Sequence, residues 1–506
     1  MKGEAEIRAA IVTAEDVTAA EDGAPDGKGG SRDLVLAKKL HNDAGNGARF
    51  RARYGRDLMC VPAIGRYHWT GGHGAGHWSL RDGDQNWGLL AQKTAEALMW
   101  RELAALEQSG AEAARVFELR QWAVQSGNKA RLDAMQSVSE PYLARRVDQL
   151  DADPYLFNVQ NGTLELVPKG AKGGVRLRRA ARTDLITRIA AVGYDRDAEC
   201  VQFRRFLDRV VPDKDVQAWL QKWCGYALTG NASEHVLVML LGEGRNGKGT
   251  LVRLLAWLWG DYSVSISFAS LAADDRRRGG EASPDLARLP GVRLAFAAEP
   301  RKGVRLDDGR IKELTGEDRQ VARKLNRDPF EFDPVFKLAI QANNRPRIAD
   351  TSTGMWARVR LVPFNVTIPE GERDHELLDK LKREGPGILN WCLDGFLAWR
   401  DTGLAPPAPI AAATAEYRRD SDDLGLFLEA ATVAGDGVRS AELYACYEGW
   451  AIAMDQRAIN KTRFGRDLTT RGYAGEQRGS NRVVWRCGLA FSPAAQAREW
   501  PWGEPI

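Results

Sequence analysis

The stretch His235–Thr250, HVLVMLLGEGRNGKGT, decides the fold. Its apolar first half has the length and composition of a buried strand, and Leu251–Leu258 continues the chain as an apolar helix. A glycine-rich loop lies between them. Strand, glycine loop and helix in this order predict a phosphate-binding loop, because glycines let backbone N–H groups face phosphate oxygens and the helix N-terminus adds positive potential.

Two side chains of this loop have the required chemistry. We expect Lys248 to reach the β and γ phosphates of a nucleotide and Thr250 to ligate Mg²⁺, although the strict pattern has no residue like Gly249 between lysine and hydroxyl. ATP and Mg²⁺ are therefore the expected cofactors. The predicted nucleotide-binding residues are Gly242, Gly244, Asn246, Gly247, Lys248, Gly249 and Thr250. A Gly-Lys-Gly-Thr ending also suits small-molecule nucleotide kinases, so the loop alone leaves kinase and motor ATPase open.

Two downstream apolar segments end in polar side chains. Residues 291–298 form a strand candidate followed by Glu299, which we expect to hold Mg²⁺ or orient the attacking water, either alone or together with another acid such as Asp318. Residues 336–342 form another, followed by Asn343, whose amide can bond the γ phosphate or the water. Motor ATPases have one strand that ends in an acidic residue and another that ends in an amide residue. This arrangement favours a motor ATPase over a kinase.

The motifs occur in an order that resembles the superfamily III helicases, in particular the helicase part of phage and plasmid primases and of the poxvirus primase-helicase. The segments that carry the resemblance are Gly242–Thr250, Glu299, Ile311–Asp318, Ala342–Pro346 and Gly354–Phe364, with Asp43–Phe50, Asp153–Thr163 and Cys224–Gly230 upstream. The resemblance implies an α/β fold with an AAA+ core that assembles as a ring, usually a hexamer, with ATP between subunits.

The same resemblance assigns roles at the subunit interface and in the channel. Lys248, Glu299, Asn343 and Arg358 become the predicted catalytic residues, with Arg358 as an arginine finger that acts on the neighbouring subunit. Residues 312–327 correspond to a hairpin in the central channel, where basic side chains contact phosphates without reading sequence. The predicted channel contacts are Lys312, Arg323 and Lys324.

The C-terminal part has the element order of a winged-helix domain. Seven basic and two acidic residues lie between Lys461 and Arg486, an excess larger than the net charge of +4 of the whole chain. This pattern predicts a duplex or origin contact through Arg463, Arg466 and Arg471, with protein docking as the alternative. In the N-terminal part His68, His73 and His77 form no familiar metal pattern, and we expect exposed turn histidines.

Composition bounds the class of protein. Apolar residues make up 44% and charged residues 28% of the 506, which is typical of a soluble multidomain protein. Six scattered cysteines, no signal peptide and no long apolar run favour the bacterial cytoplasm of a host, without membrane insertion. The predicted division is a flexible leader 1–30, an α/β accessory domain 31–195, a helical connector 196–232, the ATPase 233–400, a linker 401–420, the winged-helix domain 421–492 and a tail 493–506.

We therefore predict an ATP-dependent replicative helicase of a phage, plasmid or integrated element that moves on single-stranded and forked DNA, 3′ to 5′ as its relatives usually do. The accessory region shows no recognisable acidic metal triad, so we expect primer synthesis to need a separate primase. One alternative is an origin-recognition or loading factor that uses ATP as a switch without unwinding. The other is a nucleotide kinase.

Overall fold

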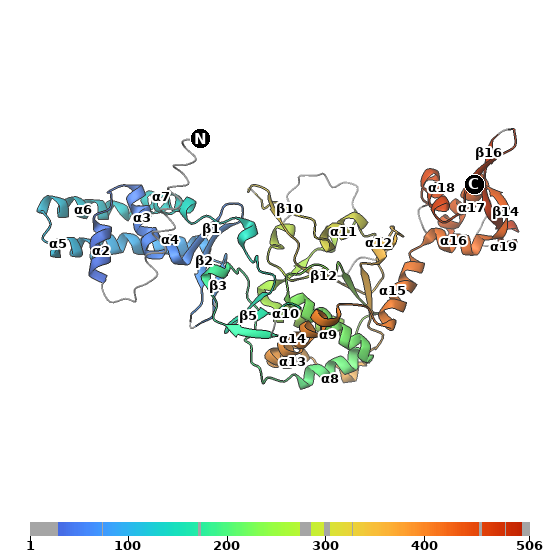
Figure 1. The fold of residues 1–506 in the computed structure, drawn as a ribbon, viewed down its shortest axis with the longest axis horizontal. Coiled ribbons are helices and arrows are strands. Elements are labelled where there is room, and N and C mark those ends of the chain that lie inside the picture. The colour runs from blue at the N-terminus through green and yellow to red at the C-terminus, as the bar shows by residue number, and fades with distance from the viewer. Residues whose placement is uncertain are drawn as a thin grey trace.

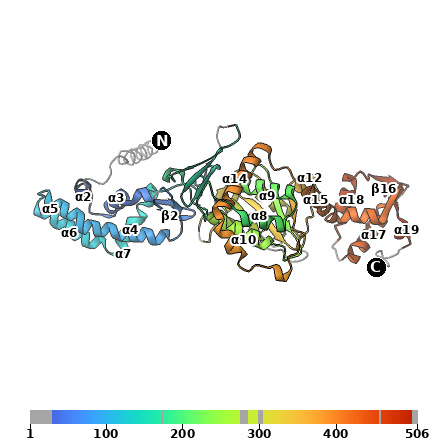
Figure 2. The same cartoon turned by 90° about the horizontal axis from the view of Figure 1, so that it is seen from below.

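The structure, a computed structural model, describes residues 29–72, 74–170, 174–273, 285–297, 304–325, 327–454, 458–480 and 482–497. The described chain is elongated, with a helical N-terminal body, a central body around a parallel sheet, and a small C-terminal body in a row (Figures 1 and 2). Apart from helix α2 at its end, the predicted leader lies outside the described residues. No helix among the described residues is both long and apolar enough to cross a membrane.

The N-terminal body combines a helical bundle with a small antiparallel sheet. Its elements are α2 (Gly29–Ala37), α3 (Asp43–Tyr54), α4 (Gly83–Ala97), a π-helix (Leu98–Glu102), α5 (Leu103–Gln108), α6 (Ala113–Ser126) and α7 (Lys129–Ser137), with β1 (Leu58–Val61), β2 (Gly65–Thr70) and β3 (His77–Ser79). The expectation of exposed turn histidines is wrong for His68 and His77. Both lie in paired strands and are partly covered by neighbouring residues, while His73 lies outside the described residues.

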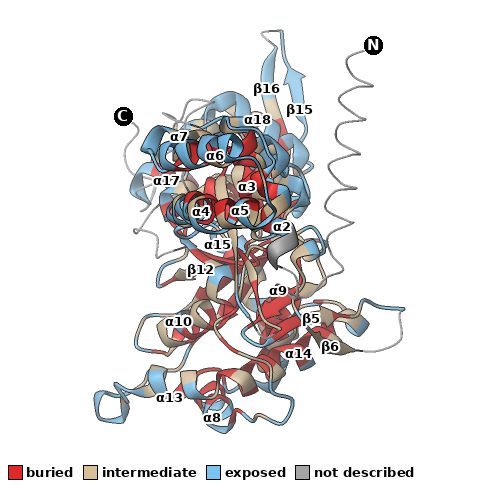
Figure 3. Ribbon diagram, turned by 90° about the vertical axis from the view of Figure 1, so that its left-hand side faces the viewer, coloured by how far each residue is buried: buried red, intermediate tan, exposed pale blue. Residues whose placement is uncertain are grey.

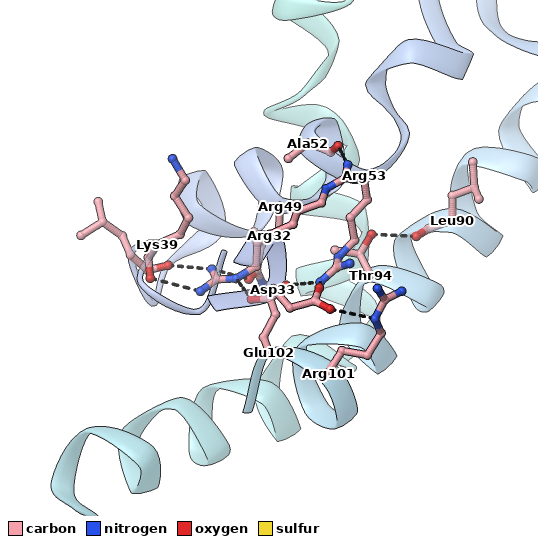
Figure 4. Close-up of polar contacts among 12 residues, drawn as sticks. Arg32, Asp33, Lys39, Arg49, Ala52, Arg53, Leu90, Thr94, Arg101 and Glu102 are labelled. Carbon is pink, nitrogen blue, oxygen red and sulfur yellow. Dashed lines mark hydrogen bonds and ion pairs between the residues drawn. The ribbon is translucent and has the colours of Figure 1, made fainter. Parts of the chain in front are cut away.

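A fully buried ion pair holds this bundle together. Arg49 on α3 donates from Nε to Glu102 at 2.8 Å, and both side chains are 0% exposed (Figure 4). The guanidinium also donates to the carbonyls of Lys39 and Leu40, and Arg53 reaches the second Glu102 oxygen at 2.8 Å. Because the partners of Arg49 and Arg53 lie on the π-helix and on the connection between α2 and α3, the network fixes α3 against both.

The central body is built on a five-stranded parallel sheet. Its strands are β7 (Leu237–Leu241), β8 (Ser263–Ile266), β9 (Leu294–Ala297), β12 (Lys337–Ala342) and β13 (Val359–Pro363), in the order β13-β7-β12-β9-β8. The first four residues of β7 are fully buried, as expected for a central parallel strand covered on both faces. The predicted α/β fold is confirmed, and its core is a parallel sheet.

Helices and a second small sheet share the core of this body. They are α8 (Val201–Val210), α9 (Lys214–Leu228), α10 (Lys248–Trp259), α13 (Leu377–Arg383) and α14 (Gly385–Thr402), with the antiparallel strands β4 (Leu156–Val159), β5 (Gly162–Leu166) and β6 (Val175–Arg178). Helices α9 and α14 approach closely, because a Cβ on Gly225 or Gly395 would lie 1.9 Å from the backbone of the other helix.

The small sheet β4–β6 shares the hydrophobic core of the central body and is also bonded to the N-terminal one, since Asn158 on β4 donates to the carbonyl of Gly76 at 2.8 Å. Phe157 on β4 stacks on Tyr262 with ring centroids 4.5 Å apart, and both belong to the core cluster of α8, α9 and α10. The predicted domain boundary at residue 195 therefore differs from the packing, since aromatic contacts between distant segments are not visible in a local pattern.

The connection to the C-terminal body is a helix. Helix α15 (Ala408–Asp420) occupies most of the segment that we predicted as a linker, 401–420, and its Tyr417 is buried against Trp356 with centroids 5.1 Å apart. The proline-rich start marks only the N-terminus of this helix, where proline is tolerated.

The C-terminal body has its own hydrophobic core. It contains α16 (Asp423–Ala431), β14 (Thr432–Arg439), α17 (Ser440–Ala453), α18 (Lys461–Thr470), β15 (Gly475–Arg478), β16 (Val483–Phe491) and α19 (Pro493–Gln496). Strand β16 pairs with both β14 and β15, and the β15–β16 hairpin projects away from the domain as an exposed ribbon (Figure 3).

Candidate functional site

The glycine loop between β7 and α10 takes a conformation that requires glycine. Gly244 has φ +99° and Gly247, the residue that caps α10, has φ +82°. A Cβ on Gly247 would also lie 2.4 Å from Cγ1 of Val210 on α8. The loop thus reaches the N-terminus of α10 by a left-handed turn packed against a neighbouring helix, which directs the first N–H groups of α10 toward the loop.

Asn246 fixes the loop from inside. Its side chain is 3% exposed and donates from Nδ2 to the carbonyl of Phe364 at 3.1 Å. A Cβ on Gly242 would lie 2.2 Å from that Nδ2 atom. Asn246 therefore ties the loop to the segment that follows β13, a role that loop composition alone did not show.

Lys248 and Asn343 meet at the carboxyl edge of the sheet. Nζ of Lys248 donates to Oδ1 of Asn343 at 3.0 Å and also to the carbonyl of Gly242. The lysine side chain is 2% exposed. The pair forms because β7 and β12 are parallel neighbours with Leu241 opposite Ala342, so that residues following the two strands lie side by side.

Other predicted nucleotide-site residues lie around this pair. Thr250 is partly exposed in the first turn of α10. Glu299 lies outside the described residues, but β9, the strand before it, ends at Ala297 beside Ile340 on β12, at the same sheet edge. Gln341 was not among the predicted residues, although it is a polar residue in an apolar strand. Its Nε2 would be 3.7 Å from a Cβ on Gly249.

Arg358 lies at the other end of the strands, where β7 and β13 begin, opposite the glycine loop. It immediately precedes β13, and its carbonyl accepts from the N–H of Leu237, the first residue of β7, at 2.9 Å. Since β7 runs from this edge to the glycine loop, Arg358 cannot reach the loop of its own chain. Its Nε is buried without a hydrogen-bond partner in the described part of the chain.

Asp318 lies near that opposite edge as well. Its neighbour Glu317 has a carboxylate oxygen 3.7 Å from Nε2 of His235, two residues before β7. Asp318 thus lies near the end of the sheet opposite the end of β9 at Ala297, which does not favour the suggested role shared with Glu299, a residue outside the described part of the chain.

The predicted channel residues lie in α11 (Asp308–Thr315) and in the hairpin of β10 (Gln320–Ala322) and β11 (Phe330–Phe332). Lys312 is ion-paired with Asp350. Arg323 is exposed and donates to the carbonyl of Arg327 at 3.2 Å across the hairpin tip. Lys324 is half-buried and donates to the carbonyl of Ile64 in the N-terminal body at 3.2 Å; burial lowers its pKa.

The three predicted basic residues of the C-terminal body differ in their surroundings. Arg466 is exposed on α18. Arg463, also exposed, donates to the carbonyl of Ala349 in the central body at 3.3 Å. Arg471 makes two hydrogen bonds to the carboxylate of Asp422, at 2.8 and 2.6 Å, and so holds α18 to the start of α16. Of the three, Arg466 is the one for which the described part of the chain shows no side-chain hydrogen bond or ion pair.

These features define a class of protein: a mixed α/β protein with a glycine loop, a buried lysine and an amide at the carboxyl ends of the strands of a parallel sheet. Family models match two parts of it. Residues 47–212 match the model described as "D5 N terminal like", and residues 240–358 match a family of unknown function, DUF5906.

Curated relatives come from large DNA viruses. A mimivirus protein of Acanthamoeba polyphaga, named "Putative helicase L207/L206", is 27% identical over 329 residues, covering 60% of this chain and 33% of its own length. "Putative helicase 121R" of invertebrate iridescent virus 3 is 23% identical, covering 60% of this chain and 36% of its own length. "Putative primase C962R" of African swine fever virus is 26% identical, covering 48% and 25%. The chain thus spans about a third of the length of the mimivirus and iridescent virus relatives.

Among solved structures, the C-terminal region of NrS-1 aligns with 87% of this chain and 98% of its own, at 12% identity and a TM-score of 0.43. This chain therefore carries a D5 N-terminal-like domain and a DUF5906 domain, and it is similar to viral proteins named putative helicase and putative primase.

Proposed function

We propose that this chain is the ATP-driven motor of a replicative DNA helicase with an AAA+ core. The observation that carries the proposal is the contact of Lys248 with Asn343 beside a glycine loop that caps a helix. A lysine that reaches the terminal phosphates and an amide that reports their presence are the two protein groups that phosphate-loop motors need at that position. The names of the viral relatives, helicase and primase, agree with this function.

The residues at the sheet edge fit ATP and Mg²⁺. A loop with left-handed glycines at the start of α10 leaves backbone N–H groups for phosphate oxygens, and Lys248 is already held over the loop by Gly242. Thr250 and Glu299 would hold Mg²⁺, which supplies charge neutralisation of the phosphates when bound. Asn343 would orient the lytic water or the γ phosphate from the neighbouring strand.

A complete site in this proposal needs a second copy of the chain. Arg358 lies at the end of the sheet opposite its own glycine loop and has a buried Nε without a partner in the described chain. A guanidinium delivered by the next protomer would stabilise charge in the transition state, so hydrolysis depends on assembly of a ring, which we take to be a hexamer. The β10–β11 hairpin would then face single-stranded DNA in the shared channel, with 3′ to 5′ movement and a separate primase as partner.

We also propose that the C-terminal body is a winged-helix domain. Its order of helices and strands, with α18 after α17 and an exposed β15–β16 hairpin, supports a helix-turn-helix with a wing. The exposed Arg466 on α18 favours duplex DNA as its ligand. The same feature supports the second candidate function, an origin-recognition or loading factor.

Strand displacement on forked DNA tests the proposal. The purified chain with ATP and Mg²⁺ should release the labelled strand, and Lys248→Ala should not. ATP-dependent DNA binding without strand release would favour the loading factor, and phosphate transfer to a nucleoside monophosphate without DNA would favour the kinase.

A further inference from the structure

The β10–β11 hairpin is packed against the N-terminal body of its own chain. Ala322, Phe330 and Phe332 of the hairpin are at most 7% exposed and share one hydrophobic cluster with Met59, Val61 and Ile64 of the N-terminal sheet. The short helical turn Val147–Gln149 also contacts β11. The apolar contact between the hairpin and the N-terminal body is therefore part of the hydrophobic core of the central body.

Two basic residues at the hairpin tip complete this contact. Lys324 Nζ donates to the carbonyl of Ile64 at 3.2 Å, and Arg327 Nη1 donates to the carbonyl of Pro62 at 3.3 Å. Both acceptors lie in the turn between β1 and β2. Backbone carbonyls in a turn have few alternative partners, so these bonds fix the tip relative to that turn.

Buried and exposed side chains alternate along the first strand of the hairpin and so define an inner and an outer face. Ala322 is 1% exposed, whereas Val321 is 61% and Leu325 is 76% exposed, with the exposed Arg323 between them. On this outer face β11 carries Glu331, and Asp333 follows the end of the strand; their carboxylates lie 3.8 and 3.0 Å from the guanidinium of Arg319. Arg323 with its apolar neighbours thus forms the outer tip, which we define as Val321, Arg323 and Leu325.

We propose that the N-terminal sheet is a buttress that positions the hairpin, so that Lys324 and Arg327 are positioning residues, and that single-stranded nucleic acid contacts the outer tip instead. The inference rests on the proposed function for its nucleic-acid ligand. It has a mechanical consequence: any displacement of the hairpin during ATP turnover is transmitted to the N-terminal body, because the two share a packed interface.

The matched variants Arg323→Met and Lys324→Met of the full-length chain test this assignment. Binding of a labelled oligothymidylate is measured over a salt series, and amide hydrogen exchange is measured in 58–67 and 320–332. Arg323→Met should lower the slope of log affinity against log salt by about 0.7, the value for one phosphate contact on a single strand. It should leave exchange in 58–67 unchanged, since the hydrogen bond that it removes, to the carbonyl of Arg327, lies within the hairpin. Lys324→Met should leave the slope unchanged and speed exchange in both segments.

Ile64→Ala provides a check from the other side of the interface, since it removes no cation. It should speed exchange in 320–332 as Lys324→Met does and leave the salt slope intact. The proposal is overturned if Lys324→Met lowers the slope like Arg323→Met while exchange in 58–67 stays unaltered, or if Ile64→Ala leaves the hairpin unaffected. A wild-type chain that binds no oligothymidylate would refute the proposed function, while the exchange measurements would still decide whether the buttress exists.

Discussion

The Nζ atom of Lys248 lies 3.0 Å from the Oδ1 atom of Asn343, although 94 residues separate them in the chain, and this contact joins the glycine loop to the neighbouring strand of the sheet. The lysine is almost fully buried, so the amide is one of the groups that set the direction of its ammonium. In the proposed motor, the same amide would exchange its lysine contact for one with the γ phosphate or water.

Asn343→Ala should slow ATP hydrolysis much more than it weakens nucleotide binding. A hydrogen bond to a charged group contributes about 1.5–3 kcal/mol, which corresponds to a loss of about 10- to 150-fold in kcat. Steady-state kinetics and binding of a fluorescent ATP analogue measure the two effects. The neighbouring exposed Asn344, changed to Ala, is the control and should retain near wild-type kcat. Equal losses in both variants would argue against a specific role for Asn343.

Glu102→Gln should destabilise the N-terminal bundle by about 3–5 kcal/mol, because it leaves the buried Arg49 guanidinium without its counter-charge. Amide exchange in α3 and α6 reports this loss locally. The surface pair Arg120–Glu107, whose side chains are 59% and 44% exposed, offers a matched control. Glu107→Gln should cost less than about 1 kcal/mol. A similar small effect for Glu102→Gln would show that the buried network contributes little.

Arg466→Ala and Arg471→Ala should separate DNA contact from domain stability. Arg466→Ala is expected to reduce duplex affinity and to lower the salt slope by about 0.9, the value for one phosphate contact on a duplex. Arg471→Ala breaks the two bonds to Asp422 and should instead speed amide exchange in α16 and α18. Fluorescence anisotropy over a salt series and exchange mass spectrometry distinguish the two. If Arg471→Ala alone changed the slope, the recognition surface would lie at the other end of α18.

Sequence patterns predicted the parts of the fold that depend on local order. The strand, loop and helix around Lys248 follow from apolar periodicity and glycine placement, and the parallel sheet follows from successive buried strands that alternate with helices. Asn343 could be placed at the same edge because residues after parallel strands share an edge.

Contacts between distant segments were not predictable in the same way. Nothing local distinguishes Lys324 from Arg323, yet one is bound by the carbonyl of Ile64 and the other is exposed. The same holds for Arg471, which looks like a recognition-helix cation but is paired with Asp422. Packing of β4–β6 with α10 and the helical nature of 408–420 likewise depend on tertiary partners such as Tyr262 and Trp356.

The central claim is that Arg358 of one protomer completes the nucleotide site of the next. Lys248→Ala should abolish turnover by removing phosphate binding, whereas Arg358→Ala should keep nucleotide binding and lose DNA-stimulated turnover. Mixing the two inactive variants in equal amounts is the most direct measurement. About a quarter of the interfaces should then pair an intact Lys248 with an intact Arg358, so about a quarter of wild-type ATPase should return. Mixed rings that show no recovery, or a monomer that hydrolyses ATP at full rate, would contradict the account.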